Sequence, residues 1–313
     1  MAQSRNGTRE CQYHGSESEK DSSPLMTAGT ETAQWYGIAA TRRNRIRVYD
    51  KPNEDFALAD NASRIYMVLD GVSRTPRPGR PYANPSPAAV ATELFASVTH
   101  AKLRAAPAGM APAERLRRAA AAGNEAVADY NRRTFPRIDY LENNPAGCVG
   151  VLALIEKGHL HYAYLGDCSG RLLSPDGALR LFTRSQTAPL SRVLPSLGLS
   201  GDERTIHIRR DICNNRHHEY GFGVFNGAPG AMDFLVTGSL PLTGNETILL
   251  ATDGMDPLFD TTVSPALLAM SPEELLISCE RIEDQRPDLR SDDKTVVVIQ
   301  GRTRPATLCP ASP

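Results

Sequence analysis

From about residue 34 the chain alternates short apolar runs with polar turns, a pattern typical of β-strands. The turns Lys157-Gly158 and Asp176-Gly177 separate consecutive runs and predict two antiparallel hairpins. The first two strands are expected to pair with each other across a polar loop. The predicted strands cover residues 37–46, 56–59, 65–69, 148–155, 160–165, 170–174, 178–183, 247–252 and 295–300.

Two long segments with apolar residues at helical spacing lie between the third and fourth predicted strands. The first begins at Ser86, a favoured N-cap, with Pro87 at the first helical position, and extends to residue 103. The second covers residues 112–133, and further helices are expected at 265–270 and 272–284. Hairpin-rich sheets with helices inserted in blocks predict an α+β fold rather than a doubly wound parallel sheet.

Composition and charge narrow the class of protein. The 313 residues are 41% hydrophobic and 23% charged, which is ordinary for a soluble globular protein. A formal net charge of −1 gives no reason to expect a nucleic acid or a membrane as partner. No apolar run approaches the roughly 18 residues that span a bilayer. The six cysteines are scattered without a paired spacing, so free thiols and a cytoplasmic location are expected.

The ends of the chain differ from its middle. Residues 1–33 are rich in Ser, Glu, Asn and Gly and are expected to be disordered, because they offer little apolar surface to bury. They lack the apolar core of a secretory signal. Residues 303–313 are expected to form a flexible tail, which leaves residues 34–302 as the folded domain.

Aspartates mark the ends of three apolar runs, at Asp70-Gly71, Asp253-Gly254 and Asp292-Asp293. A single Asp-Gly pair is ordinarily a turn, and Asp176-Gly177 inside its hairpin is interpreted in that way. Carboxylates at several strand ends, however, are expected to meet at one edge of a sheet. Such carboxylates would repel one another, and hard divalent ions such as Mg²⁺ or Mn²⁺ prefer oxygen ligands. The pattern therefore predicts a metal site.

Six short motifs follow one another along the chain: Asn53-Glu54-Asp55, Met67-Val68-Leu69-Asp70-Gly71-Val72, Tyr164-Leu165-Gly166-Asp167-Cys168, Leu181-Phe182-Thr183-Arg184, Leu249-Leu250-Ala251-Thr252-Asp253-Gly254 and Asp292-Asp293-Lys294-Thr295-Val296-Val297-Val298. In this order they resemble the motifs of the metal-dependent serine/threonine protein phosphatases of the 2C type, the PPM family. The resemblance extends over residues 34–302 and implies a four-layer α-β-β-α sandwich, in which two mainly antiparallel sheets are flanked by helix pairs.

The resemblance also implies a site with two Mn²⁺ or Mg²⁺ ions. Asp70 would bridge both ions, and Asp253 and Asp292 would hold the first. The Gly71 carbonyl and Glu54 would serve the second ion. Asp70, Asp253 and Glu54 are thus expected to carry catalysis.

The activity implied by the resemblance is hydrolysis of phosphoserine and phosphothreonine by a hydroxide that bridges the ions. Asp55 would orient ligands or metal-bound waters from outside the coordination sphere. Gly166-Asp167 corresponds to a structural turn of the family. The implied partners are phosphoprotein substrates, in the company of a serine/threonine kinase or its targets, and the protein is expected to be a monomer.

The sequence departs from the family pattern where the substrate phosphate is usually held. The family places an arginine four residues before the glutamate, and this chain has Asp50 there. Lys51, Arg47 and Arg74 are the candidate replacements, since each flanks an acidic motif. This departure keeps open an alternative function, an inactive 2C-like pseudophosphatase that acts as a metal-binding interaction or regulatory module.

A third metal ion is the other open point. Family members often carry an additional aspartate before the central hairpin, where it binds a weaker third ion. In this chain the residues at that place are Glu142, Asn143 and Asn144, so the sequence leaves open whether a third ion binds.

Overall fold

The computed structural model describes residues 33–45, 51–74, 79, 81–261, 267, 270–286 and 292–302, all within the compact unit that spans residues 32–313. The segment predicted to be disordered, apart from Ala33, lies outside these residues. So do the predicted tail 303–313, Arg47 and most of the helix predicted at 265–270. The domain limits 34–302 therefore stay a prediction.

Within the described residues, ten strands form two five-stranded sheets in which all paired strands are antiparallel, as the sequence predicted. The first sheet has the order β1 (Gln34–Arg42), β10 (Lys294–Arg302), β9 (Thr247–Ala251), β6 (Ser169–Leu173) and β7 (Leu179–Leu181). The second has the order β2 (Phe56–Asp60), β3 (Ile65–Gly71), β4 (Cys148–Glu156), β5 (His159–Leu165) and β8 (Val236–Pro241).

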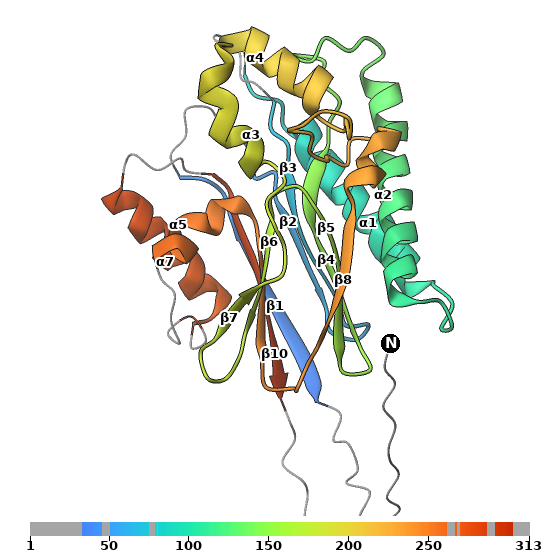
Figure 1. Ribbon diagram of the computed structural model, residues 1–313, viewed down its shortest axis with the longest axis vertical. Helices are drawn as coiled ribbons and strands as arrows, with labels where there is room; N and C mark the ends of the chain where they lie inside the picture. The colour runs from blue at the N-terminus through green and yellow to red at the C-terminus, as the bar shows by residue number, and fades with distance from the viewer. Residues whose placement is uncertain are drawn as a thin grey trace, which may run out of the picture. The chain divides into compact units, whose positions relative to one another are not determined.

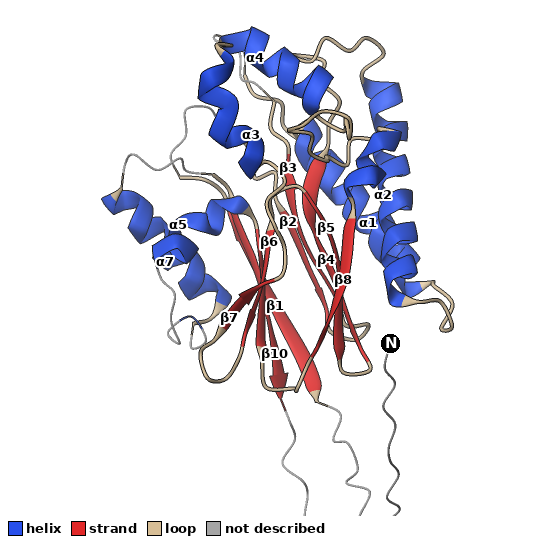
Figure 2. Cartoon of the chain, in the orientation of Figure 1, coloured by secondary structure: helices blue, strands red, loops and turns tan. Residues whose placement is uncertain are grey.

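Helices cover the outer face of each sheet, which completes the expected α-β-β-α layers (Figures 1 and 2). The helices α1 (Pro87–Arg104) and α2 (Pro112–Thr134) pack on the second sheet, and α7 (Pro272–Gln285) packs on β1 and β10 beside α5 (Asp256–Thr261). The larger apolar core fills the space between the sheets and under α1, where Phe95 stacks on Phe225 with ring centroids 4.3 Å apart. A second core lies under α7.

The start of α1 follows from its sequence as predicted. The Ser86 hydroxyl accepts a hydrogen bond of 3.1 Å from the Ala89 amide, and Pro87 needs no amide partner at the first helical position. Ser271 caps α7 in a similar way, with Glu274 completing a capping box.

One predicted pairing is wrong. The first two strands exist, but β1 pairs with β10 and β2 pairs with β3, so the two lie in different sheets. The two strands therefore do not form a hairpin with each other. Because β10 lies about 250 residues further along the chain, the local pattern does not show that β1 will pair with it.

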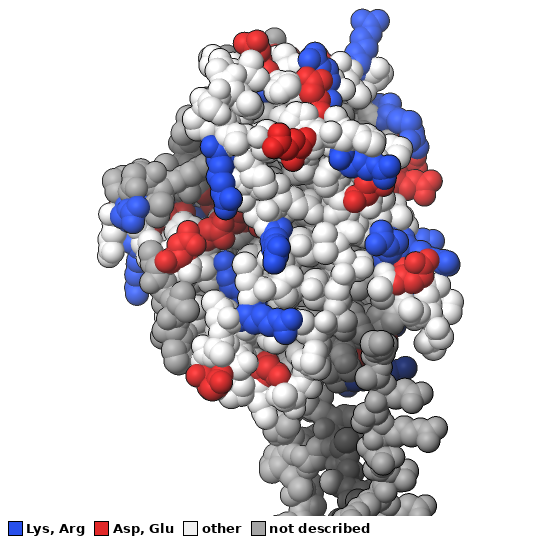
Figure 3. Space-filling model, in the orientation of Figure 1, with Lys and Arg blue, Asp and Glu red and all other residues white. Residues whose placement is uncertain are grey.

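The sequence did not predict the short elements α3 (Ala188–Val193), α4 (Gly201–His207), α5 and β8. None of the residues of α4 is buried, and β8 is an edge strand with one buried residue, Leu240, so neither has a strong apolar pattern. In the described part of the chain, no helix has the length and apolar character needed to cross a membrane. Figure 3 shows acidic and basic side chains interspersed over one face of the molecule, with a group of acidic side chains beside α5.

Candidate metal centre

The predicted acidic residues lie at one rim of the two sheets, and strand register explains why. Phe56, at the start of β2, is opposite Leu69, near the end of β3. Ala251, at the end of β9, is opposite Val296, near the start of β10. Each acidic motif directly precedes or ends one of these strands, so the antiparallel register brings the motifs to the same end.

Three of the predicted ligands, Asp70, Asp253 and Asp292, form what we call the aspartate cluster. Burial, followed by the negative charges of Asp55, Asp253, Asp167 and Asp292, raises the pKa of Asp70 well above its usual value. Carboxylates from four separate segments therefore act on this one side chain. A pKa raised by neighbouring negative charge indicates a place where a cation would be stabilised.

Asp55 lies beside the aspartate cluster and accepts a hydrogen bond of 2.9 Å from the Thr252 hydroxyl. Burial, and after it the charge of Asp293, raises the pKa of Asp55 to about 8, against the opposing effect of hydrogen bonds from Thr252 and Thr295. Asp167 also belongs to this neighbourhood, because its charge raises the pKa of Asp70. The sequence had assigned Asp167 only to a structural turn.

The chemistry of the aspartate cluster fits a hard divalent ion, since carboxylate oxygens are the ligands that Mg²⁺ and Mn²⁺ prefer. Within the residues that the structure describes, however, no three His, Cys, Asp or Glu side chains are arranged as a finished cage. Binding would therefore require the carboxylates to be drawn together around the ion. The assignment of these ligands remains a proposal.

Glu54, predicted to serve a second ion, is in a different environment. Its side chain is 1% exposed, and Oε1 accepts hydrogen bonds from the hydroxyls of Tyr82 (2.9 Å) and Ser86 (2.5 Å). Oε2 accepts a hydrogen bond from the Ser73 hydroxyl and lies 3.1 Å from the Lys51 ammonium. We call Glu54 and these four donors, Lys51, Ser73, Tyr82 and Ser86, the Glu54 cluster.

Lys51, predicted to contact substrate phosphate, points into this cluster. Its Nζ lies 3.4 Å from Asp292 Oδ1 and 3.2 Å from Asp293 Oδ2, and it donates to the Ser73 hydroxyl at 2.8 Å. Although burial acts in the opposite direction, the charges of Glu54, Asp292 and Asp293 raise the pKa of Lys51 above its usual value. The ammonium group is therefore charged and surrounded by carboxylates.

Arg74, the other described candidate for phosphate binding, also faces protein groups. Its guanidinium carbon lies 4.2 Å from the ring centroid of Phe135, and its NH2 group donates to the Asn144 carbonyl at 3.3 Å. The Arg74 amide donates to the Tyr82 hydroxyl at 3.0 Å, which ties this loop to the Glu54 cluster. Arg47 lies outside the described residues.

Two glycines at the rim allow close approach of neighbouring backbone. A Cβ atom on Gly71 would lie 2.6 Å from the Glu54 carbonyl oxygen. A Cβ atom on Gly254 would lie 1.9 Å from the Asp293 carbonyl oxygen, closer than atoms can approach. The glycines after Asp70 and Asp253 are therefore required by packing between motifs, a reason that the sequence alone did not give.

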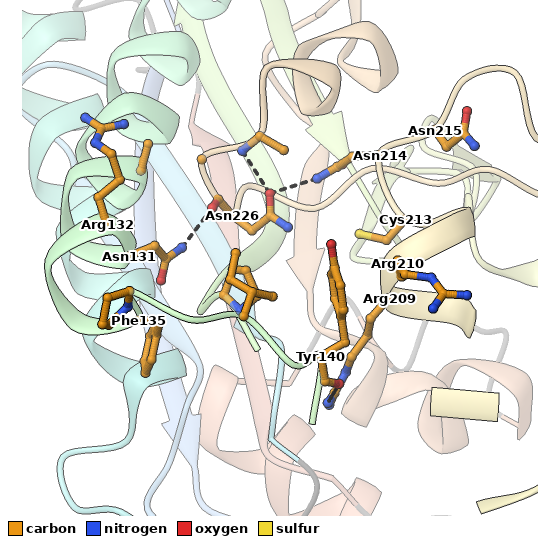
Figure 4. A pocket seen from close by; sticks show the side chains of 16 residues that line it. Asn131, Arg132, Phe135, Tyr140, Arg209, Arg210, Cys213, Asn214, Asn215 and Asn226 are labelled. Carbon is orange, nitrogen blue, oxygen red and sulfur yellow. Dashed lines mark hydrogen bonds between the residues drawn. The ribbon is translucent and has the colours of Figure 1, made fainter. Parts of the chain in front are cut away.

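A cavity of about 690 Å³ lies near the Glu54 cluster, between the end of α2 and the segments at 135–145 and 209–215 (Figure 4). Its wall is held by amide hydrogen bonds: Asn131 donates to the Asn226 carbonyl and Asn214 donates to the Asn226 side chain, both at 2.8 Å. Arg209 lines the cavity and also donates to the Ser73 carbonyl at 3.1 Å, which connects the cavity wall to the Glu54 cluster.

The sequence did not predict Ser73, Tyr82 and Ser86 as neighbours of Glu54. It also gave Asp293, next to the predicted ligand Asp292, no role in the site. Asp293 accepts hydrogen bonds from the backbone amides of Asn44 (2.8 Å) and Glu54 (3.0 Å). The doubled aspartate at 292–293 was the available signal for this role. Tyr82 stands in the proline-rich loop before α1, where nothing in the sequence indicates the direction of a side chain, and the N-cap role predicted for Ser86 gave no sign of its contact with Glu54.

No known family model matches the sequence, and no curated protein matches it either. Solved structures do match. The serine/threonine phosphatase PstP/Ppp of Mycobacterium tuberculosis is 22% identical with a TM-score of 0.60, covering 86% of this chain and 99% of that one. The PstP catalytic domain in complex with two manganese ions is 21% identical with a TM-score of 0.59, and the match covers 86% of this chain and 99% of that one.

The PPM Ser-Thr phosphatase MsPP of Mycobacterium smegmatis, in complex with cacodylate, is 18% identical with a TM-score of 0.51. The match covers 84% of this chain and 97% of that one. At these identities the likeness establishes the fold, which is the two-sheet sandwich of the PPM phosphatases.

Proposed function

We propose that this protein is a divalent-metal-dependent phosphatase that hydrolyses phosphoserine and phosphothreonine in proteins. The observation that carries the proposal is the meeting of Asp70, Asp253 and Asp292 at one rim of a PPM-type sandwich, where burial, and after it the charges of neighbouring carboxylates, raises the pKa of Asp70. The motif order in the sequence and the likeness to PstP and MsPP support it.

In this proposal Asp70, Asp253 and Asp292 hold the metal, with Mn²⁺ or Mg²⁺ as the ion. A bound divalent ion would supply Lewis acidity toward the phosphoryl group and a water of lowered pKa. The Thr252 hydroxyl fixes Asp55 through its hydrogen bond, and Asp293 fixes the backbone before β2 through its contact with the Glu54 amide. These two contacts keep the segments that bear the ligands in register.

The proposal is tested with purified full-length protein and a phosphothreonine peptide. We expect hydrolysis that Mn²⁺ stimulates and EDTA abolishes. Asp253→Ala is expected to lower kcat/KM by at least about 1,000-fold, since the lost ligand serves the metal that activates water. The matched control is Asp176→Ala, which removes the aspartate of another Asp-Gly pair, one that lies in an exposed hairpin turn. Wild-type turnover no greater than that of Asp253→Ala would refute the proposed phosphatase activity.

The pseudophosphatase remains the second candidate because the Glu54 cluster and Arg74 favour it. The described cations predicted to hold phosphate, Lys51 and Arg74, are engaged by protein groups. This candidate predicts Mn²⁺ binding by calorimetry without any hydrolysis. The two measurements on one preparation separate the candidates.

A further inference from the structure

The Glu54 carboxylate has its hydrogen-bonding capacity filled by protein groups. A carboxylate offers about four lone-pair positions on its two oxygens. Tyr82 and Ser86 donate to Oε1, while Ser73 donates to Oε2 and the Lys51 ammonium lies 3.1 Å from the same oxygen. No lone-pair position is left for a metal ion or for a water bound to one. Glu54 therefore does not fit the part in holding a second ion that the family resemblance implies for it.

The Lys51 ammonium supplies a positive charge at this side of the rim. It lies between 3.1 and 3.4 Å from oxygens of Glu54, Asp292 and Asp293, which come from two segments far apart in the sequence. Its side chain is 21% exposed, so solvent screens these contacts only in part. An ammonium has three N–H donors and no acceptor. Ser73 and the three carboxylates are enough to occupy them all.

We infer that Lys51 takes the place of the second divalent ion, so that this protein binds one metal ion tightly, at the aspartate cluster. The inference rests on the proposed function for the first ion, and it removes Lys51 from the candidates for phosphate binding. A divalent ion bound to Glu54 Oε2 would share this oxygen with the Lys51 ammonium, which lies 3.1 Å from it, and two cations on one oxygen repel each other.

The experiment counts Mn²⁺ ions per chain by isothermal titration of the full-length, metal-free protein. We expect one tight equivalent for the wild type and two for Lys51→Ala, because removal of the ammonium frees a position on Glu54 and the local positive charge together. Lys51→Arg keeps the charge and is expected to stay at one. Lys102→Ala changes an exposed lysine of α1 and is the matched control, also with one equivalent.

A further variant separates charge from free lone pairs. Ser73→Ala opens one position on Glu54 Oε2 but leaves the ammonium in place, so it is expected to bind one ion. Two equivalents in Ser73→Ala would show that the hydroxyl, and not Lys51, excludes the ion. Circular dichroism establishes that each variant is folded before titration.

The results distinguish this inference from the proposed function. Two tight equivalents in the wild type would overturn the inference whether or not Lys51→Ala folds, and would leave the phosphatase proposal standing. One equivalent in both the wild type and a folded Lys51→Ala would also overturn it. One ion in the wild type and two in Lys51→Ala, but no hydrolysis, would refute the phosphatase and leave the inference intact.

Discussion

The Glu54 cluster and the aspartate cluster lie at the same rim, yet negative charge is stabilised differently in each. Glu54 is fully buried and receives hydrogen bonds from three hydroxyls, with the Lys51 ammonium beside it. The groups that most affect Asp70, after burial, are other carboxylates. A carboxylate surrounded by donors is part of the folded framework, whereas carboxylates that act on one another favour binding of an external cation.

The comparison is tested most strongly by neutralising Glu54. Glu54→Gln is expected to destabilise the metal-free protein by about 3 kcal/mol, because an amide NH₂ would face hydroxyl and ammonium donors in a buried site. The measurement is the free energy of unfolding in urea, with EDTA present. Glu125→Gln on the exposed face of α2 is the control and should leave this free energy unchanged. A Glu54→Gln protein as stable as the wild type would show that the Glu54 cluster is not structural.

The two helix N-caps give a sharper and smaller test. Ser86 and Ser271 both cap helices that begin with proline, but only Ser86 also donates to a buried carboxylate. We expect Ser271→Ala to cost about 1 kcal/mol and Ser86→Ala about 2 kcal/mol, the difference being the lost donor to Glu54. Urea unfolding of the wild type and both variants measures the two losses in the free energy of unfolding. Equal losses would mean that the Ser86 hydroxyl contributes only as a cap.

The smallest expected effect concerns how the free energy of unfolding changes with pH. At the far end of β2, Asp60 Oδ2 lies 2.8 Å from His100 Nε2. Although burial opposes the effect, hydrogen bonds from His100 and Ser63 lower the pKa of Asp60 to about 2. A lowered pKa stabilises the folded state above the ordinary pKa of about 4, and this stabilisation is lost as the pH falls toward 2.

Asp60→Asn is therefore expected to lower the free energy of unfolding at pH 7 by about 1 kcal/mol, with the difference disappearing near pH 2.

Asp70 has a raised pKa, so its ionisation opposes folding of the metal-free protein at neutral pH. Asp70→Asn should consequently stabilise at pH 7 in EDTA, and this gain should vanish below about pH 4. Denaturation curves at several pH values measure the change in the free energy of unfolding for both variants. A change in the same direction for Asp60→Asn and Asp70→Asn at pH 7 would contradict the contrast between a carboxylate held by donors and one surrounded by carboxylates.

The positions of Asp70, Asp253 and Asp292 could be predicted because these residues stand at the ends of apolar runs, where the local pattern is strong, while their role as metal ligands stays a prediction. Asp70, Asp253 and Asp292 all lie at strand ends on one rim, as expected. The α+β class followed from the hairpins and the paired helices, and the four layers were implied by the family resemblance. The pairing of β1 was wrong because register between distant strands depends on packing and not on local composition.

The Glu54 cluster could not be predicted because it is assembled by side chains from irregular segments. Lys51 and Ser73 are 22 residues apart and still share a hydrogen bond. Tyr82 reaches Glu54 from a loop whose backbone has no repeating geometry, so sequence spacing carries no directional information there. The family resemblance predicted Glu54 as a metal ligand from its position in a motif. In the structure, hydroxyl and ammonium donors surround its carboxylate instead.

The contact between Gly254 and Asp293 has a consequence for how the protein can vary. The carbonyl of Asp293 occupies the space where any side chain at position 254 would begin. The segment after β9 and the segment before β10 can therefore move or lengthen only together, since neither has clearance from the other. In natural or engineered variants of this protein, the two segments that bear Asp253 and Asp292 should therefore vary as one unit.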